Sequence, residues 1–260
     1  MLTVPQFLAK KQTGAKLTML TAYDYLTASI LDETEVDAIL VGDTLGMVIQ
    51  GKSTTLPVSL DEIIYHAEMV VRATKKSLVV VDLPFPGAHL GPKRTLEAAA
   101  RILKETGAPA IKIEGGAEIA ETIACLTNAG IPVMAHCGLQ PQSVHQTGGY
   151  RVAKDHTRIL EDAEVLEDAG AFCVLLECVP AELAADVTQA LLVPTLGIGA
   201  GPYCDGQVLV THDLLGLTSE PHPKFVKKYI DLKEAAQGAI SQFCQDVQTK
   251  RFPSEKHSYH

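Results

Sequence analysis

Eight short apolar segments recur along the 260 residues of the chain, and helical patterns separate most of them. The segments lie at 16–22, 37–43, 77–84, 110–115, 132–138, 172–179, 193–201 and 207–216. Most are near-continuous apolar runs, a pattern typical of parallel strands that are covered on both faces. Their short length, their β-branched residues and the Gly or Pro at their ends favour strands over buried helices.

Helical patterns lie between these segments, for example at 61–74, 95–106, 117–129 and 157–169. Asp61, Thr95 and Thr157 are plausible start signals for three of them. A strand–helix unit repeated about eight times predicts an α/β fold of the (β/α)₈ TIM-barrel type. The alternative is a doubly wound open sheet, which usually carries an early G-x-G-x-x-G after its first strand. The sequence lacks that motif.

Length and composition favour one soluble domain. A chain of 260 residues can bury one large core, and no linker divides it. We therefore expect residues 1–260 to form a single barrel domain with C-terminal helices, notably at 231–250. The net charge of −9 argues against general attraction to nucleic acid or to an anionic membrane.

The expected location of the protein and the redox state of its cysteines are inferred from patterns that the sequence lacks. The first residues show no apolar run after a basic start, and no stretch approaches the length of a membrane span. The six cysteines form no C-x-x-C pair. We expect a cytoplasmic protein without structural zinc.

Polar residues end five successive predicted strands: Asp43, Asp82, Glu114, His136 and Glu177. In a parallel barrel the carboxyl ends of all strands lie on one rim, where active sites are found. One polar residue at a strand end could be a solvated or capping group. Five in succession indicate a functional site.

Three carboxylates placed close together would repel one another strongly in a pocket of low dielectric. A bound cation resolves this, and an all-oxygen ligand set favours Mg²⁺ before Ca²⁺. The carboxylates are those of Asp43, Asp82 and Glu114. If His136 were a ligand instead, the choice would shift toward manganese or zinc.

Two further residues have two interpretations each. Lys112 lies two residues before Glu114 and points to the same side of a strand, where it could stabilise an oxyanion or form a salt bridge to Glu114 or Asp82. Glu177 has apolar neighbours that would raise its pKa, which suits a general base, although a structural hydrogen bond is the alternative.

Loops add less. The "GIGAG" at 197–201 is better explained as a tight loop than as a phosphate site. The long polar stretch 139–156 is expected to be functional or mobile. The residues alone thus predict a divalent-metal barrel enzyme with a separate carboxylate base. That combination suits carbon–carbon bond chemistry beside a carbonyl group.

Ten motifs, in order along the chain, closely resemble the ketopantoate hydroxymethyltransferase family. They are LTAYDY (20–25), VGDTLGMVIQG (41–51), TTLPV (54–58), VDLPF (81–85), KIEGG (112–116), GLQPQSV (138–144), GGYRV (148–152), LLECVP (175–180), GIGAG (197–201) and DGQVLV (205–210). The resemblance implies a (β/α)₈ barrel of the phosphoenolpyruvate/pyruvate-binding superfamily. It also implies transfer of a hydroxymethyl group from 5,10-methylenetetrahydrofolate to 3-methyl-2-oxobutanoate, giving 2-dehydropantoate in pantothenate and coenzyme A biosynthesis.

The resemblance further implies Mg²⁺, one ion per subunit, and cytoplasmic homo-oligomers that are commonly decamers. Carried over by motif, Asp43, Asp82 and Glu114 match the metal ligands, and Glu177 matches the proposed proton acceptor. The positions that match keto-acid contacts or pocket-lining residues are Asp43, Thr44, Asp82, Lys112, His136 and Tyr23.

Three residues near the site depart from the family pattern: Thr44 replaces serine, Cys137 replaces leucine or isoleucine, and Gln140 replaces threonine. These changes bear on loop conformation and folate affinity more than on reaction type. Two alternative functions are a carbon–carbon lyase of the same superfamily that acts on a 2-oxo acid, and a barrel that binds without catalysis.

Overall fold

The computed structural model describes residues 1–149, 152–219 and 221–259. Tyr150 and Arg151, which belong to the GGYRV motif, lie outside this range. The chain forms two compact units, Met1–Leu209 and Val210–His260. The expectation of one domain over residues 1–260 stays a prediction. No helix among the described residues is long and apolar enough to cross a membrane.

The first unit is a closed parallel barrel, as predicted. Its strands are β1 (Leu17–Thr21), β2 (Ala38–Val41), β3 (Leu78–Asp82), β4 (Ala110–Glu114), β5 (Val133–Gly138), β6 (Cys173–Glu177), β7 (Thr195–Ile198) and β8 (Gly206–Leu209). Each strand pairs in parallel with the next, and β8 returns to pair with β1. The closed order excludes the doubly wound open sheet.

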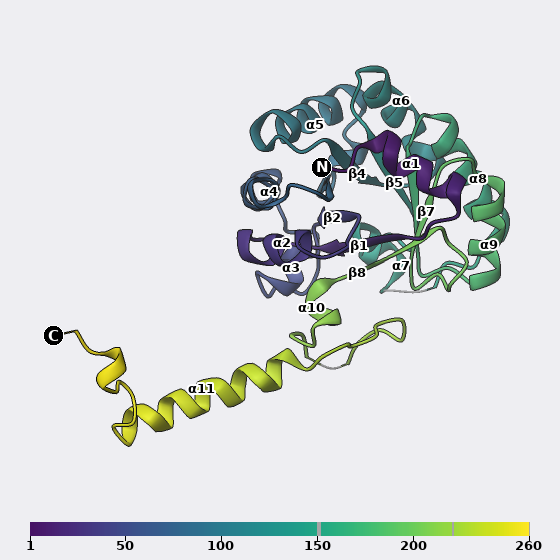
Figure 1. The fold of residues 1–260 in the computed structure, drawn as a ribbon. Helices are drawn as coiled ribbons and strands as arrows, with labels where there is room; N and C mark the ends of the chain where they lie inside the picture. Colours follow the sequence, from purple (N-terminus) through teal and green to yellow (C-terminus); the bar gives the residue numbers. More distant parts are fainter. Residues whose placement is uncertain (150–151, 220, 260) are drawn as a thin grey trace. The chain divides into compact units, whose positions relative to one another are not determined.

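Helices surround the strands (Figure 1). They are α2 (Tyr25–Asp32), α3 (Leu45–Val48), α4 (Leu60–Ala73), α5 (Pro92–Thr106), α6 (Ala120–Asn128), α7 (Val144–Thr147), α8 (His156–Asp168) and α9 (Ala181–Ala190). Short 3₁₀ turns lie at η1 (Gly87–His89), η2 (Ala117–Ile119) and η3 (Pro141–Ser143). The stretch 139–156 thus contains a 3₁₀ turn and a short helix on the rim.

The predicted helix starts were wrong by one to three residues. Helix α4 begins at Leu60 because Ser59 and Glu62 form a capping box around its first turn. Helix α5 begins at Pro92, three residues before Thr95, after Gly91 adopts a φ of 87°. A proline at the first helical position fits there because it has no N–H to leave unpaired.

Strands β2, β3 and β4 are buried at every position, whereas β1 and β8 each expose one residue. Along the buried strands, alternate residues enter different clusters. Ile39, Val79 and Ile111 belong to the cluster that strands form with the surrounding helices. Leu40 and Val80 belong to a second cluster inside the barrel. This two-sided burial accounts for the near-continuous apolar runs of the sequence.

Helix α1 (Val4–Thr13) closes the end of the barrel at which the strands begin (Figure 1). Its Phe7 is fully buried among interior residues and packs edge-on against Phe172, with ring centroids 5.7 Å apart. Lys11 donates to the carbonyls of Thr188 and Val193 at 2.8 and 3.0 Å. The opposite end is therefore the open rim.

The second unit contains α10 (Thr211–Leu214), α11 (Leu232–Gln248) and the 3₁₀ turn η4 (Glu255–His257). Helix α11 matches the predicted helix at 231–250, and Asp231 caps it by accepting from the Glu234 N–H at 3.0 Å. Phe252 packs against Phe243 and His257, with ring centroids 5.5 and 5.0 Å apart.

Candidate active site

The two-residue period of the strands brings the predicted polar residues together inside the rim. Val80, Ala110, Met134 and Leu175 all face the barrel interior. Two residues further along their strands lie Asp82, Lys112, His136 and Glu177, and Glu114 follows Lys112 by two more. The interior is therefore apolar near the beginning of the strands and charged near their ends.

Lys112 forms an ion pair with Asp82. The two are register neighbours on β4 and β3, and the ammonium lies 2.9 and 2.8 Å from the two carboxylate oxygens. Burial alone would lower the pKa of Lys112, but the charges of Asp82, Glu114 and Asp43 outweigh burial and raise it. Of the two salt bridges considered from the sequence, the one to Asp82 is present.

Asp82 lies beside Asp43, the first acidic residue of the cluster in the sequence. Its Oδ2 accepts from the backbone N–H of Asp43 at 3.4 Å. Burial and the charge of Asp43 raise the pKa of Asp82 to about 6, against the opposing effect of Lys112. Asp82 is thus ionised at neutral pH, and the positive charge of Lys112 offsets much of the energetic cost of burying its carboxylate.

Glu114 is held by a residue that sequence reasoning missed. Its Oε1 accepts from the backbone N–H of Gln142 at 2.9 Å, and the Gln142 side chain donates to Asp43 Oδ2 at 3.0 Å. Burial raises the pKa of Glu114 well above its ordinary value. The only signal for Gln142 was its place in the GLQPQSV motif of the long polar stretch.

His136 lies between two glutamates. Its Nε2 is 2.9 Å from the Leu139 carbonyl oxygen, which can only accept, so Nε2 carries the proton. Nδ1 lies 3.5 Å from Glu114 Oε2 and has no hydrogen-bond partner among the described residues. Burial and the charge of Lys112 lower the pKa of His136 well below its ordinary value. The ring is therefore neutral.

Glu177 ends β6 and has the most accessible carboxylate of this group, with 17% of its side chain exposed. Its Oε2 lies 3.4 Å from His136 Nε2. Burial, supported by the charges of Asp43 and Asp82, raises its pKa to about 8. A carboxyl group with this pKa can take up and return a proton near neutral pH.

The backbone beside Glu177 is constrained on both sides. Cys178 follows it with a φ of 49°, uncommon for a residue with a side chain. Gly138 pairs with it from β5 with a φ of 95°, and a Cβ there would lie 2.6 Å from the Glu177 carbonyl oxygen. A glycine is therefore required for β5 to approach the end of β6.

Tyr23 and Thr44 lie next to the cluster in sequence and structure. Tyr23 is buried just after β1, and its carbonyl oxygen is 2.6 Å from His66 Nδ1. Thr44 is half-buried directly after Asp43, at the start of α3, and its hydroxyl makes no capping hydrogen bond. Their predicted substrate contacts stay predictions.

The chemistry of the cluster fits a hard divalent cation. Three carboxylates, when ionised beside Lys112, leave an excess of two negative charges, which such an ion would balance. No group of three or more His, Cys, Asp or Glu side chains at metal-ligand spacing occurs in the part of the chain that the structure describes. Mg²⁺ does not need such a cage, because it commonly binds through one or two carboxylates and retained waters.

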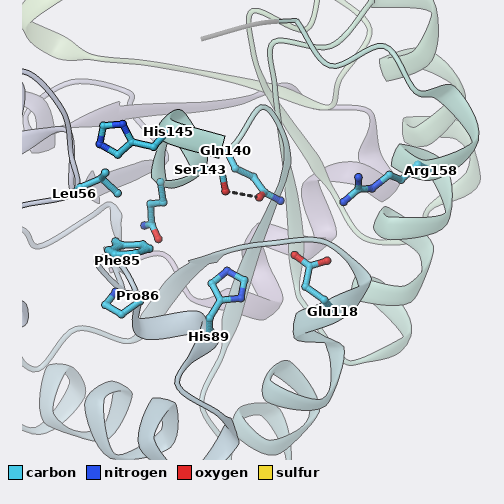
Figure 2. A pocket seen from close by; sticks show the side chains of 10 residues that line it. Leu56, Phe85, Pro86, His89, Glu118, Gln140, Ser143, His145 and Arg158 are labelled. Carbon is cyan, nitrogen blue, oxygen red and sulfur yellow. Dashed lines mark hydrogen bonds between the residues drawn. The ribbon is translucent and has the colours of Figure 1, made fainter. Parts of the chain in front are cut away.

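A cavity of about 760 Å³ opens on the rim beside the buried cluster. Its lining residues are Leu56, Phe85, Pro86, His89, Glu118, Gln140, Gln142, Ser143, His145 and Arg158. Figure 2 shows Leu56, Phe85 and His145 on one side of it and Glu118 and Arg158 on the other. Since Gln142 also contacts Asp43, the cavity adjoins the carboxylates.

The chain matches known proteins over nearly its whole length. Residues 1–255 match the family model described as ketopantoate hydroxymethyltransferase. The chain is 55% identical over 249 residues to 3-methyl-2-oxobutanoate hydroxymethyltransferase of Rhodopirellula baltica, covering 96% of this chain and 93% of the relative. The enzyme of the same name from Trichlorobacter lovleyi is 52% identical over 261 residues, covering 99% and 98%.

Solved structures with less similar sequences share the fold. A phosphonopyruvate hydrolase complexed with oxalate and Mg²⁺ superposes with a TM-score of 0.63 at 14% identity, covering 99% of this chain and 93% of that one. A 2,3-dimethylmalate lyase, a member of the PEP mutase/isocitrate lyase superfamily, gives 0.62 at 16% identity, covering 99% and 92%. These structures support the predicted barrel class.

Proposed function

Because the chain belongs to the ketopantoate hydroxymethyltransferase family, we propose that the charged rim of its barrel is where a hydroxymethyl group is joined to 3-methyl-2-oxobutanoate. The product is 2-dehydropantoate, and the reaction belongs to pantothenate biosynthesis. The observation that carries the assignment of the site is the placement of Glu177, with its raised pKa, beside a buried group of three carboxylates and a lysine. The relatives favour neither a lyase nor a non-catalytic barrel.

Asp43, Asp82 and Glu114 would hold one Mg²⁺ per subunit. When bound, the ion supplies positive charge that favours negative charge on the 2-oxygen of the keto acid. Lys112 keeps Asp82 ionised and adds a second positive charge to the same pocket. Thr44 and Tyr23 would contact the keto acid from the loops that follow β2 and β1.

Glu177 would remove the proton from C3 of the keto acid. Its raised pKa makes it a stronger base than an exposed carboxylate, and the proton it takes up can be returned later. His136 Nε2 lies 3.4 Å from Glu177 Oε2, and because the ring is neutral it places no positive charge beside the base. The carbanion formed at C3 then forms the new carbon–carbon bond to the one-carbon unit. Water supplies the oxygen of the hydroxymethyl group, and tetrahydrofolate is the leaving group.

We assign the outer cavity to the co-substrate, 5,10-methylenetetrahydrofolate. A volume of about 760 Å³ lies within the range for ligands of this size, and it adjoins the carboxylates through Gln142. Phe85, 44% exposed at the cavity, offers a ring against which a pterin could stack. Assembly into a homodecamer in the cytoplasm is part of the same proposal.

The test incubates purified protein with Mg²⁺, 3-methyl-2-oxobutanoate and methylenetetrahydrofolate and follows 2-dehydropantoate by mass spectrometry. The absence of product from folded, metal-loaded protein would contradict the proposal. A second assay follows deuterium exchange at C3 of the keto acid without folate. Glu177→Gln should exchange more slowly than wild type, whereas the exposed control Glu182→Gln should exchange at the wild-type rate. Equal rates for all three proteins would assign the base to another group.

A further inference from the structure

Gln142 connects the rim loop to two of the three carboxylates. It lies in η3 on the stretch 139–149, and only 7% of it is exposed. Its backbone N–H donates to Glu114 Oε1 at 2.9 Å. Its side-chain amide donates to Asp43 Oδ2 at 3.0 Å and to the carbonyl oxygen of Leu83 at 3.3 Å. One residue thus contacts the ends of β2, β3 and β4.

The groups that accept from the Gln142 side chain determine how its amide is oriented. A carboxylate and a carbonyl can only accept, so the NH₂ group must face them. The other glutamine of the same loop behaves differently, because Gln140 is half-buried on the cavity wall and accepts from the Ser143 hydroxyl at 3.2 Å. The loop therefore offers one glutamine to the carboxylates and one to the cavity.

A carboxylate that ligates a metal is usually held by a hydrogen bond from a neighbouring residue, which fixes its orientation before the ion arrives. We propose that Gln142 is such a positioning residue: it orients Asp43 and Glu114 for the divalent cation and thereby links cation binding to the order of the rim loop. This inference rests on the proposed metal site. A purely structural anchor would hold the loop without affecting cation affinity.

Thermodynamic linkage between cation binding and loop docking acts in both directions, which gives a second consequence. If the contacts of Gln142 favour the cation-binding arrangement of Asp43 and Glu114, then a bound cation favours the docked loop. Since the same loop lines the outer cavity, loading the cation would also order one wall of that cavity.

The test compares wild type with Gln142→Leu and with the matched control Gln140→Leu. Mn²⁺ affinity is measured by electron paramagnetic resonance in the absence of substrates. We expect Gln142→Leu to bind Mn²⁺ about 10- to 100-fold more weakly than wild type, the usual effect of removing such a partner. Gln140→Leu should retain wild-type affinity, because it contacts neither carboxylate.

Hydrogen exchange of residues 139–149 provides a second readout, which reports on the loop and not on cation affinity. Mn²⁺ should slow exchange there in wild type and in Gln140→Leu, but not in Gln142→Leu at equal Mn²⁺ saturation. Unchanged loop exchange in wild type that is saturated with Mn²⁺, wild-type affinity in Gln142→Leu, or no Mn²⁺ binding by wild type would each overturn the inference.

These outcomes are separate from those of the activity assay. Wild type that binds Mn²⁺ and responds as expected, yet forms no 2-dehydropantoate, would contradict the proposed reaction and leave the role of Gln142 intact. Wild type that forms product while Gln142→Leu behaves identically in both measurements would contradict the role of Gln142 alone.

Discussion

Glu177→Gln should slow the reaction strongly and, at neutral pH, make the protein more stable. Glutamine has the shape of the protonated glutamate that the folded protein holds below a pH of about 8. The substitution therefore preserves packing at the end of β6 while removing the titrating group. Loss of a general base of this kind costs roughly 10²- to 10⁴-fold in rate.

The gain in stability follows from the difference in pKa between the two states. Below a pH of about 4.5, Glu177 is protonated in both the folded and the unfolded chain, so its ionisation contributes nothing. As the pH rises towards 8, the unfolded chain releases the proton and the folded chain keeps it. Wild type then loses stability by up to about 1.4 kcal/mol per pH unit. With pKa values of 4.5 in the unfolded chain and about 8 in the folded chain, the loss is about 3 kcal/mol at pH 7 and at most about 5 kcal/mol above pH 8.

The measurement is denaturant unfolding of both metal-free proteins between pH 4.5 and 8.5 at one protein concentration. Asp82 and Glu114 are present in both proteins, so their titration largely cancels in the difference. The free energy of unfolding of the variant relative to wild type should be near zero at pH 4.5 and should rise with pH. A difference that stays constant over this range would refute the raised pKa, and with it the physical reason for assigning Glu177 as the base.

Lys112→Met should lower the free energy of unfolding by about 3 kcal/mol at pH 8, because Asp82 would stay buried without its cation. Without Lys112, which lowers the pKa of Asp82, that pKa lies above its wild-type value of about 6. The loss should therefore shrink as the pH falls from 8 to 6 and Asp82 of the variant takes up a proton, and denaturant titrations at both pH values would show the change. Gly138→Ala should lower both stability and the rate of C3 exchange, since a Cβ would lie 2.6 Å from the Glu177 carbonyl oxygen; a wild-type exchange rate would contradict this. Phe7→Ala should cost about 3 kcal/mol or more in stability, yet leave C3 exchange by the folded protein unchanged, because α1 closes the opposite end of the barrel.

The barrel could be predicted from the sequence because most of its strands are buried on both faces. Runs such as Val79–Val81 pack against helices with one residue and enter the interior with the next, so every position is apolar. The charges that interrupt such runs then stand out. Asp82, Glu114 and Glu177 were found in this way, because burying a charge at the end of a strand is costly unless a partner or a ligand compensates for it.

Other features leave little trace in a single sequence. Gln142 lies on a loop, and nothing in its type or spacing indicates that its amide reaches a carboxylate 99 positions earlier in the chain. The start of helix α5 was also predicted wrongly. Thr95 resembles an N-cap, but it is buried inside α5 and donates to the Gly87 carbonyl oxygen at 2.6 Å. In both cases a tertiary contact decided the outcome, which local patterns do not contain.

The two ends of the barrel contribute to stability in opposite ways. At the closed end, Phe7 and Phe172 fill the interior with apolar rings. At the rim, Asp82, Glu114 and Glu177 end strands β3, β4 and β6, and burial raises the pKa of each. A raised pKa in a carboxyl group means that its ionised form opposes folding at neutral pH. The packing at the closed end must therefore offset the charges at the rim, and this is why the variants at the two ends should separate stability from catalysis.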